Sequence, residues 1–333
     1  MELNQNSLPL CPRELDSFRP PEWAANRTPR RHTSLSRGRG DTKLLVNLAF
    51  AEHAEEVAAL DVDGVGLLRA EFMVTDALAG VHPKLLIERG QRTTFVDALV
   101  EPLLTITRAF EGRPVYYRFL ESRSDEFALL EGADRFEIAE ENPMIGLRGC
   151  FRAVRDPDVF RLELDAVARV FTDSANLRVV IPFVRSAWEL RACLDLIRES
   201  AIGDDLLVSV MAEVPSAAYR VFEYGAMGVR GVTIGLQNLT QLTLGVDRDS
   251  LATDGLFDKT DAAVCDTVSR IITRANMAGI ESSITGIPSN QPIYIEKLVR
   301  LGVRAISVNP DDLVVARNAL DHVATGNLDS STS

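Results

Sequence analysis

Short β-rich apolar runs alternate with helix-compatible polar and apolar stretches from Lys43 onward. This alternation is expected of βαβ units that build a parallel sheet. Eight apolar runs can be counted, at 44–48 (LLVNL), 64–68 (GVGLL), 115–120 (VYYRFL), 177–183 (LRVVIPF), 207–212 (LVSVMA), 231–236 (GVTIGL), 282–287 (SSITGI) and 305–308 (AISV). Eight repeats match a closed (β/α)8 TIM barrel better than an open doubly wound sheet. No Gly-rich dinucleotide fingerprint follows the first run, so a Rossmann fold lacks its usual support.

Two long segments interrupt the alternation, at 121–150 after the third run and at 237–262 after the sixth. In a barrel, the loops that follow strand C-termini build the active-site face, so we expect both segments to contribute to a site. The chain ends have a different composition. We expect a flexible Arg- and Pro-rich extension over 1–41, the barrel over 42–324, and a disordered tail over 325–333.

The composition of 46% hydrophobic and 25% charged residues is that of a soluble globular enzyme. No run of 18 apolar residues and no apolar stretch after a basic start is present, so we expect a cytoplasmic protein without a membrane segment. The net charge of −12 argues against a nucleic-acid partner. The seven arginines within 1–40 are the exception, and they suit either an anion-binding arm or a solvated or partner-docking extension. The four cysteines form no CxxC pair, which predicts buried thiols instead of zinc ligands or disulfides.

Arginines recur where the predicted strands end. A cation beside a barrel core is costly unless an anion uses it, and guanidinium groups match carboxylates and phosphates in a bidentate manner. Any one of these arginines could instead pair with a neighbouring carboxylate such as Glu71 or Glu121, but their recurrence favours a small, doubly anionic ligand. The arginines at strand ends or in the long segments are Arg69, Arg118, Arg148, Arg185 and Arg248.

Glu213 ends the run VSVMAE, and Asn238 follows the run VTIGLQ on the next strand. We therefore expect both side chains at the barrel mouth. A carboxylate and an amide oxygen are acceptable ligands for Mg²⁺, although a site with one carboxylate should bind the ion weakly. A salt bridge between Glu213 and an arginine is the alternative.

The residues from Thr42 to about Val315 carry a family resemblance. The matching stretches are TKLLVNLA, VDGVGLLRAEF, VYYRFLESRSDEF, EENPMIGLRGCFR, NLRVVIPFV, VMAEVPS, TIGLQNLTQLTLGVDRDS and AISVNPDDLV. Through them the chain resembles the C-terminal barrel of phosphoenolpyruvate synthase (pyruvate, water dikinase), which binds phosphoenolpyruvate (PEP) and pyruvate. It is more distantly similar to the barrels of pyruvate phosphate dikinase and of enzyme I of the sugar phosphotransferase system.

The resemblance implies a barrel that binds PEP or pyruvate with Mg²⁺ at its mouth. The family arginines that hold or orient the phosphate map onto Arg69, Arg118 and Arg148. The arginine that contacts the carboxylate region of the ligand maps onto Arg248, and the metal-binding glutamate maps onto Glu213.

The sequence departs from the family where the chemistry takes place. The family motif GSNDLTQ reads GLQNLTQ here, so Asn238 stands in place of a metal-binding aspartate and Gln237 takes a substrate-binding position. Mg²⁺ binding is therefore expected to be weak or lost. Thr285 stands where the family motif CGQAPS has the cysteine that transfers a proton, and its hydroxyl is a far weaker acid. The motif YYRTLD has become YYRFLE, which introduces Phe119 and Glu121.

Two hypotheses remain open. The first is a divergent phosphotransferase, or the barrel subunit of a split dikinase whose ATP-binding and phosphohistidine domains are supplied in trans; Thr285 and Arg118 would then be its catalytic residues. The second is a catalytically degenerate barrel that serves as a ligand sensor or as a scaffold and dimerisation subunit. The retained arginines favour ligand binding, whereas the changes at Asn238 and Thr285 favour loss of turnover. In either case the resemblance implies a homodimer, and we expect PEP to bind weakly with little dependence on Mg²⁺.

Overall fold

The computed structural model describes residues 42–325, apart from residues 70, 72, 73, 75–77, 79 and 289. The extension expected over 1–41 and, beyond Thr325, the tail expected over 325–333 lie outside the described residues. No helix in the described part of the chain combines the length and the apolar composition needed to cross a membrane.

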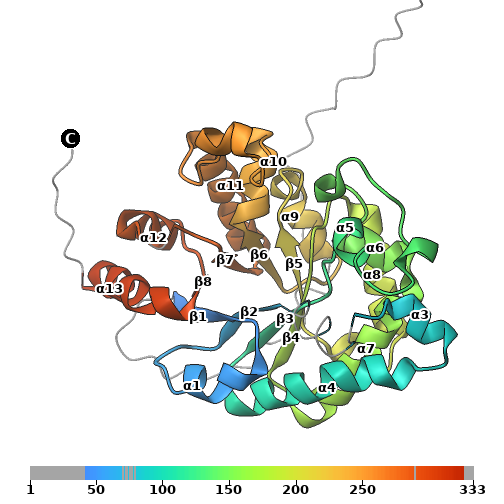
Figure 1. Ribbon diagram of the computed structural model, residues 1–333. Helices are drawn as coiled ribbons and strands as arrows, with labels where there is room; N and C mark the ends of the chain where they lie inside the picture. Colours follow the sequence, from blue (N-terminus) through green and yellow to red (C-terminus); the bar gives the residue numbers. More distant parts are fainter. Residues whose placement is uncertain are drawn as a thin grey trace, which may run out of the picture. The chain divides into compact units, whose positions relative to one another are not determined.

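Eight parallel strands form a closed barrel in which each strand pairs with its neighbours in sequence and β8 pairs with β1 (Figure 1). The predicted (β/α)8 TIM barrel is thereby confirmed. The strands are β1 (Lys43–Leu48), β2 (Val65–Arg69), β3 (Val115–Arg118), β4 (Leu177–Ile181), β5 (Val208–Ala212), β6 (Gly231–Gly235), β7 (Glu281–Thr285) and β8 (Ala305–Val308). Each overlaps one of the eight predicted runs, but four strands end before their apolar runs do: β3 at Arg118, β4 at Ile181, β6 at Gly235 and β7 at Thr285.

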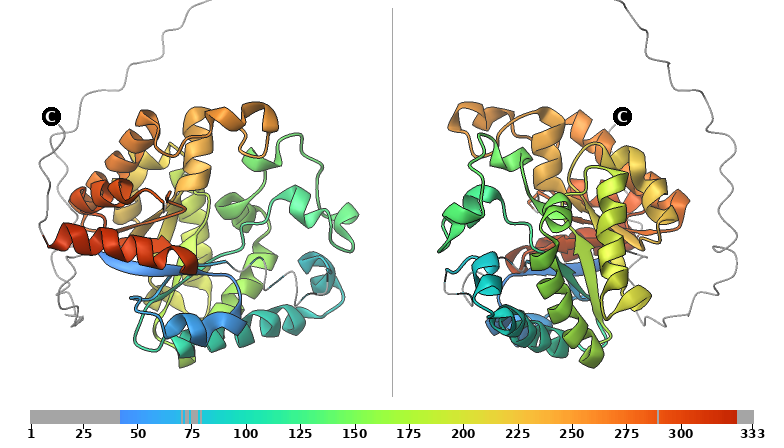
Figure 2. Two further views of the ribbon diagram at one scale, coloured as in Figure 1. Left: turned by 60° about the vertical axis from the view of Figure 1, so that its left-hand side comes forward. Right: turned by 90° about the vertical axis from the view of Figure 1, so that its right-hand side faces the viewer.

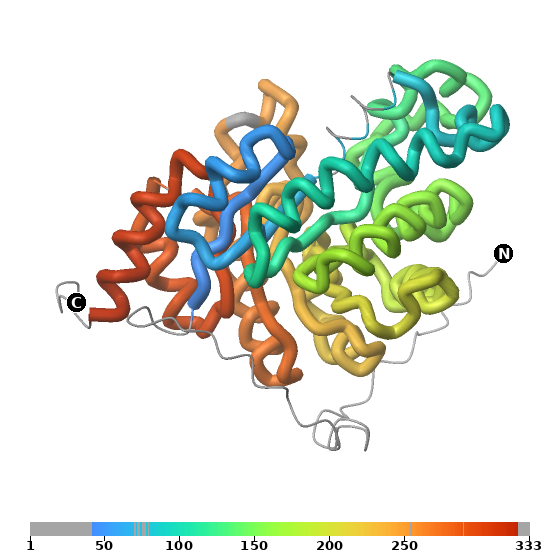
Figure 3. Tube along the Cα trace, turned by 90° about the horizontal axis from the view of Figure 1, so that it is seen from below, coloured from blue at the N-terminus to red at the C-terminus, as the bar shows by residue number. Residues whose placement is uncertain are grey.

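Helices connect the strands and surround the barrel. The α-helices are α1 (Ala54–Ala58), α3 (Pro83–Glu88), α4 (Arg92–Ala109), α5 (Ser124–Phe127), α6 (Gly149–Arg155), α7 (Pro157–Asp173), α8 (Ala187–Glu199), α9 (Ala217–Ala226), α10 (Leu236–Leu244), α11 (Ala262–Ala278), α12 (Pro292–Arg300) and α13 (Leu313–Ala324). Short 3₁₀ turns include η4 (Pro143–Ile145) and η6 (Leu251–Leu256). Neighbouring helices pack in pairs, such as α4 with α7 and α9 with α11 (Figure 3).

The main hydrophobic core lies between the strands and these helices. Every residue of β5 and β6 is buried, as expected of parallel strands that are covered on both faces. A separate, much smaller apolar cluster consists of Leu67, Val180 and Met211 with the half-buried Tyr116. Because parallel strands point alternate residues to opposite faces, this second cluster represents the inside of the barrel.

Local sequence signals set the helix ends. The Glu189 carboxylate accepts a hydrogen bond from the backbone N–H of Ser186 (2.6 Å), which completes a capping box at the start of α8. Asp261 caps α11 by accepting from the N–H of Ala263 (2.8 Å), and the helix stops at Gly279, whose φ of 67° favours glycine.

The two long segments that follow β3 and β6 rise on the same side of the barrel (Figure 2). They contain α5 and η4 in the first case, and α10 and η6 in the second. An ion pair links them, because Arg123 Nη1 lies 3.8 Å from Asp249 Oδ2. Both segments therefore border the mouth formed by the strand C-termini.

Candidate functional site

Arg118 ends β3 inside the barrel mouth between two carboxylates. Its Nη1 lies 2.7 Å from Glu121 Oε2, and its Nη2 donates to Glu71 Oε1 at 3.0 Å. The same oxygen of Glu71 accepts the backbone N–H of Glu121 (3.0 Å), so the two acids are held together. Burial opposes the charge on Arg118, but Glu71 and then Glu121 outweigh it and raise the pKa of the guanidinium above its usual value.

Arg148 reaches the same carboxylate from the long segment after β3. It donates to Glu121 Oε1 through Nη2 and to the carbonyl of Met144 through Nη1 (2.9 Å). Arg118 and Arg148 thus share Glu121, and all three side chains are buried. The sequence left open that an arginine could pair with a neighbouring carboxylate. Arg118 and Arg148 do so. Each guanidinium has five N–H donors, so the bonds to Glu121, Glu71 and Met144 leave some of them for an anion.

Phe183, just beyond β4, organises the cationic side of the mouth. The guanidinium carbons of Arg148 and Arg185 lie 4.3 Å and 4.5 Å from its ring centroid, which is cation–π distance. Its backbone has a φ of 50°, an unusual value for a bulky residue, and strain of this kind concentrates at functional sites. The strained turn directs its N–H at Glu213 Oε2, with a length of 3.0 Å.

Glu213 follows β5 and is buried beneath these groups. Its Oε1 accepts from Asn238 Nδ2 at 2.6 Å, while Oε2 accepts the Phe183 N–H. Burial raises the pKa of Glu213 to about 7; the charge of Glu121 adds to this effect, and Arg118 opposes it. A salt bridge between Glu213 and an arginine was the alternative expected from the sequence. Among the described residues, two N–H donors, from Phe183 and Asn238, contact the carboxylate instead.

Asn238 lies in α10, directly after β6, and is contacted from two sides. Its Nδ2 donates to Glu213, and its Oδ1 accepts from Arg248 Nη1 at 3.0 Å. If the amide were turned over, its NH₂ group would face the N–H donors of Arg248, and its oxygen would face the Glu213 carboxylate. The side-chain oxygen of Asn238 therefore faces the Arg248 guanidinium.

This arrangement does not fit Mg²⁺. The Arg248 guanidinium lies 3.0 Å from Asn238 Oδ1, the oxygen that would bind a cation beside Glu213, and its positive charge repels Mg²⁺ there. Over residues 42–325, apart from the undescribed positions, no group of three or more His, Cys, Asp or Glu side chains could hold a metal ion.

Arg69 and Arg248 lie at the rim of the mouth. Arg69 ends β2 and stays exposed; loss of water around it, and then the charge of Arg118, lower the pKa of its guanidinium. Arg248 is a quarter exposed, lies 3.9 Å from Asp249, and donates its backbone N–H to Gln241 Oε1 at 3.2 Å. Arg69, Arg118, Arg148 and Arg248 thus lie at or beside the mouth together with the carboxylates Glu71, Glu121, Glu213 and Asp249.

Thr285 and Gln237 are not brought into this cluster. Thr285 ends β7 and donates its hydroxyl to Asn47 Oδ1 (3.1 Å), which also accepts from the hydroxyl of Ser307 (2.7 Å). Gln237 is exposed on the first turn of α10, beside Gly286. Sequence reasoning missed Asn47 and Ser307, although both are polar residues within otherwise apolar runs.

Comparison with known proteins places this geometry in a family. Residues 26–325 match the family model described as PEP-utilising enzyme, PEP-binding domain. Over 285 residues the chain is 40% identical to a protein named "Probable phosphoenolpyruvate synthase" from Staphylothermus marinus, and over 286 residues it is 40% identical to a phosphoenolpyruvate synthase from Aeropyrum pernix. Each match covers 83% of this chain but only 34% and 35% of the relative. The chain thus spans about a third of the length of these relatives.

Similarity to solved structures is found at low sequence identity. An HpcH/Hpal aldolase/citrate lyase family protein from Burkholderia cenocepacia superposes with a TM-score of 0.49 at 15% identity, covering 87% of this chain and 97% of that chain.

Proposed function

The chain belongs to the PEP-utilising enzymes as a PEP-binding domain, and from this premise we propose that its mouth binds phosphoenolpyruvate, pyruvate or a related phospho- or 2-oxo acid. The observation that carries the proposal is the pair Arg118 and Arg148, which are buried around the carboxylate that they share, Glu121. Arg69 would add charge for the phosphate group. Arg248, on the opposite rim, would take the carboxylate of the ligand.

The ligand must compete with carboxylates already in place. Arg118 and Arg148 both contact Glu121, and Arg118 also contacts Glu71, so a dianion has to share the two guanidinium groups with these acids or displace the acids. Affinity should therefore be modest. Asn238 and Arg248 supply donors where the family places a metal site, so we expect no tightening of binding by Mg²⁺.

A phosphotransferase role would need a phosphoryl donor at the mouth. In the divergent-enzyme or split-dikinase form of the proposal, ATP-binding and phosphohistidine domains deliver it in trans, and the barrel works as a homodimer in the cytoplasm. Arg118 would then orient the phosphoryl group, and Thr285 would lie near the methylene carbon of the enolpyruvate.

A second function, ligand sensing without turnover, is favoured by one observation. The Thr285 hydroxyl, a far weaker acid than a thiol, donates its proton to Asn47 Oδ1, so it is not poised for proton transfer to a ligand. Exchange of the pyruvate methyl protons with deuterated solvent, followed by NMR, separates the functions. Exchange by the wild type supports turnover. No exchange by the wild type, with recovery in Asn238→Asp/Thr285→Cys and added Mg²⁺, supports a sensor that has lost catalysis.

Calorimetric titration tests the shared claim of anion binding. Millimolar PEP, pyruvate and oxalate should each give heat and a thermal shift with the wild type. Arg248→Gln should weaken PEP binding by about tenfold or more, since a hydrogen bond to a charged group contributes about 1.5–3 kcal/mol. Lys297→Gln, the same charge change at an exposed position of α12, serves as the control. The absence of heat and of thermal shift with all three ligands would remove the proposal.

A further inference from the structure

Glu163 is a buried acid of α7 that lies outside the charged cluster at the mouth. Its side chain is almost fully buried (2% exposed), and one of its oxygens accepts two hydrogen bonds. Oε1 accepts from the Tyr117 hydroxyl at 2.6 Å and from the backbone N–H of Leu120 at 2.8 Å. A buried carboxyl group is costly unless it is hydrogen-bonded, and here both donors belong to β3 or to the residues directly after it. Glu163 therefore ties α7 to the strand that ends in Arg118.

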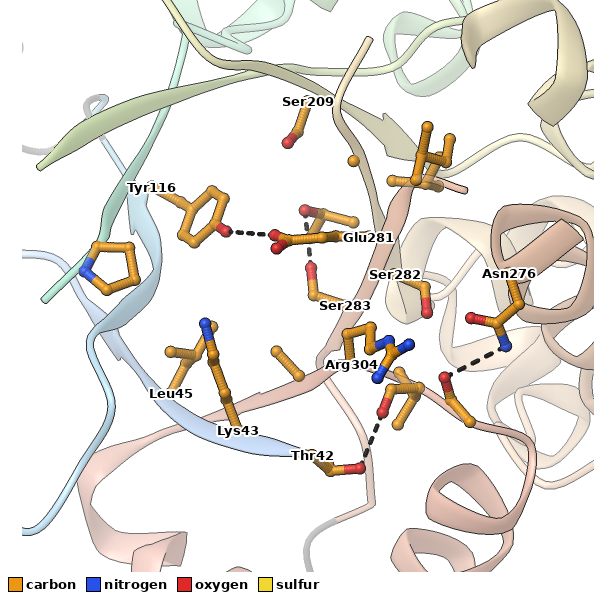
Figure 4. Close-up of a pocket in the computed structure, with 18 of the residues that line it drawn as sticks. Thr42, Lys43, Leu45, Tyr116, Ser209, Asn276, Glu281, Ser282, Ser283 and Arg304 are labelled. Carbon is orange, nitrogen blue, oxygen red and sulfur yellow. Dashed lines mark hydrogen bonds between the residues drawn. The ribbon is translucent and has the colours of Figure 1, made fainter. Parts of the chain in front are cut away.

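Glu163 meets β3 from outside the barrel, because successive residues of a strand face opposite sides. Tyr116 faces inward, where its hydroxyl donates to Glu281 Oε2 (3.2 Å) in a cavity of about 720 Å³ at the end of the barrel opposite the mouth (Figure 4). Small residues line this cavity, among them Ser209 and Gly231. Tyr117 therefore faces outward to α7, and Arg118 faces inward again, into the mouth.

The backbone N–H groups of residues 119–121 are each taken by a partner from elsewhere in the chain. The first donates to the carbonyl of Val180 on β4 at 3.1 Å, which continues the strand ladder. The second and third donate to side chains, Glu163 (2.8 Å) and Glu71 (3.0 Å). Beyond the ladder, the backbone that carries Glu121 is therefore held by two carboxyl groups, one outside the barrel and one at the mouth.

Glu71 and Glu163 differ in how a bound anion would affect them. Glu71 Oε1 also accepts from Arg118 Nη2 at 3.0 Å, so an anion that takes this guanidinium competes with Glu71 directly. Glu163 forms no ion pair in the described part of the chain, and the barrel wall separates it from the mouth. An anion can thus displace Glu71 and leave the bond between Glu163 and Leu120 intact.

We propose that Glu163 is a positioning residue of the mouth: from outside the barrel it holds the backbone that carries Glu121 while an anion competes with Glu71. This role rests on the proposed function, because it concerns how the arginine cluster keeps its arrangement when an anion binds. Without this anchor, displacement of Glu71 would free the segment that carries Glu121, whose carboxylate holds the two buried arginines side by side. Glu163 acts through the backbone and touches no ligand.

Calorimetric titration with PEP compares Glu163→Leu, which removes the acceptor, with Glu163→Gln, which keeps one. Glu163→Leu should weaken PEP binding by about tenfold or more, since small displacements of positioned groups act on this scale. Glu163→Gln should bind within about threefold of the wild type, because an amide oxygen can still accept from the N–H of Leu120. Val268→Ala, which removes buried contacts in α11, is the control: it should lower the free energy of unfolding and leave the affinity for PEP unchanged.

Amide-resolved hydrogen exchange of the wild type gives a second test that needs no variant. When PEP saturates the mouth, the N–H of Leu120 should lose less protection than that of Glu121, whose acceptor Glu71 competes with the ligand. An equal or greater loss of protection at Leu120 would overturn the inference. This measurement decides the matter if Glu163→Leu does not fold.

The titration separates failure of this role from failure of the proposed function. If the wild type binds PEP and Glu163→Leu binds it equally well, Glu163 does not position the mouth, although the proposed function stands. The same conclusion follows if Glu163→Gln binds as weakly as Glu163→Leu, or if Val268→Ala weakens binding as much. No binding of PEP to the wild type would remove the proposed function, and the role of Glu163 with it.

Discussion

Replacing Asn238 by aspartate should turn the mouth from a metal-independent site into a metal-dependent one. The substitution puts a carboxylate oxygen where Nδ2 now donates to Glu213 at 2.6 Å. Two carboxylates this close cannot both ionise, so the pair should hold one proton near neutral pH. A charge-assisted hydrogen bond is lost, which costs about 1.5–3 kcal/mol, and the neighbouring Arg248 offsets part of it. We expect Asn238→Asp to lower the free energy of unfolding by about 2 kcal/mol at pH 8, and by less at pH 6, where the shared proton is available.

Urea unfolding at pH 6 and pH 8, in EDTA and in millimolar MgCl₂, measures this effect. Mg²⁺ should restore the stability of Asn238→Asp, because adjacent carboxylates become oxygen ligands, and should leave the wild type unchanged. Asn318→Asp, the same change at an exposed position of α13, is the control. The reasoning fails if Mg²⁺ stabilises the wild type, or if Asn238→Asp is as stable as the control in EDTA.

Three further substitutions probe the fold around the site. Burial raises the pKa of Glu163 to about 8, so the wild type loses stability as the pH rises from roughly 4.3 to 8. In urea unfolding, the free energy of unfolding of Glu163→Gln should rise relative to that of the wild type across this window, by up to about 5 kcal/mol. A difference between the two proteins that does not change with pH would be evidence against this. Glu121→Ala leaves the buried guanidinium of Arg148 without a carboxylate partner and that of Arg118 with Glu71 alone, and it should cost about 3–5 kcal/mol, whereas a loss below about 1 kcal/mol would show that solvent replaces the carboxylate. Gly149→Ala adds a Cβ 2.7 Å from Phe183 Cβ at a residue whose φ is 55°. The substitution should destabilise the fold by about 1–3 kcal/mol and so lower the melting temperature. An unchanged melting temperature would mean that the strained turn relaxes freely.

The barrel could be predicted from the sequence because its strands are buried on both faces and each forms a compact apolar run. The ends of the strands were less certain. Phe119 and Leu120 continue the apolar run after β3, but Phe119 packs into the core from beyond the last paired residue, Arg118. Apolar character reports burial, and burial continues beyond the last residue of the strand.

The arginine cluster could be predicted in part. Strand C-termini meet at one end of a barrel, so Arg69 and Arg118 had to lie near each other there. That Arg148 shares Glu121 with Arg118 depends on how the segment after β3 folds back, which no periodicity encodes. Similarly, the amide of Asn238 is oriented by Arg248, which comes from the segment after α10.

The environment of Thr285 and the cavity inside the barrel follow from closure of the sheet. Thr285 meets Asn47 because β8 joins β7 to β1, a contact between residues 238 positions apart in the chain. The small residues Ser209 and Gly231 are visible in the sequence, but only their register shows that they leave a space. The resemblance pointed to the mouth, so the opposite end of the barrel drew no prediction.

The central claim, an arginine-lined mouth that binds an anion without a metal, is tested most directly by one affinity measurement. The dissociation constant of PEP for the wild type should be determined by calorimetry in excess EDTA and again in millimolar Mg²⁺. We expect measurable binding in EDTA and a constant that changes by less than about twofold with Mg²⁺. Binding that appears only with Mg²⁺, or that tightens about tenfold or more, would contradict the account.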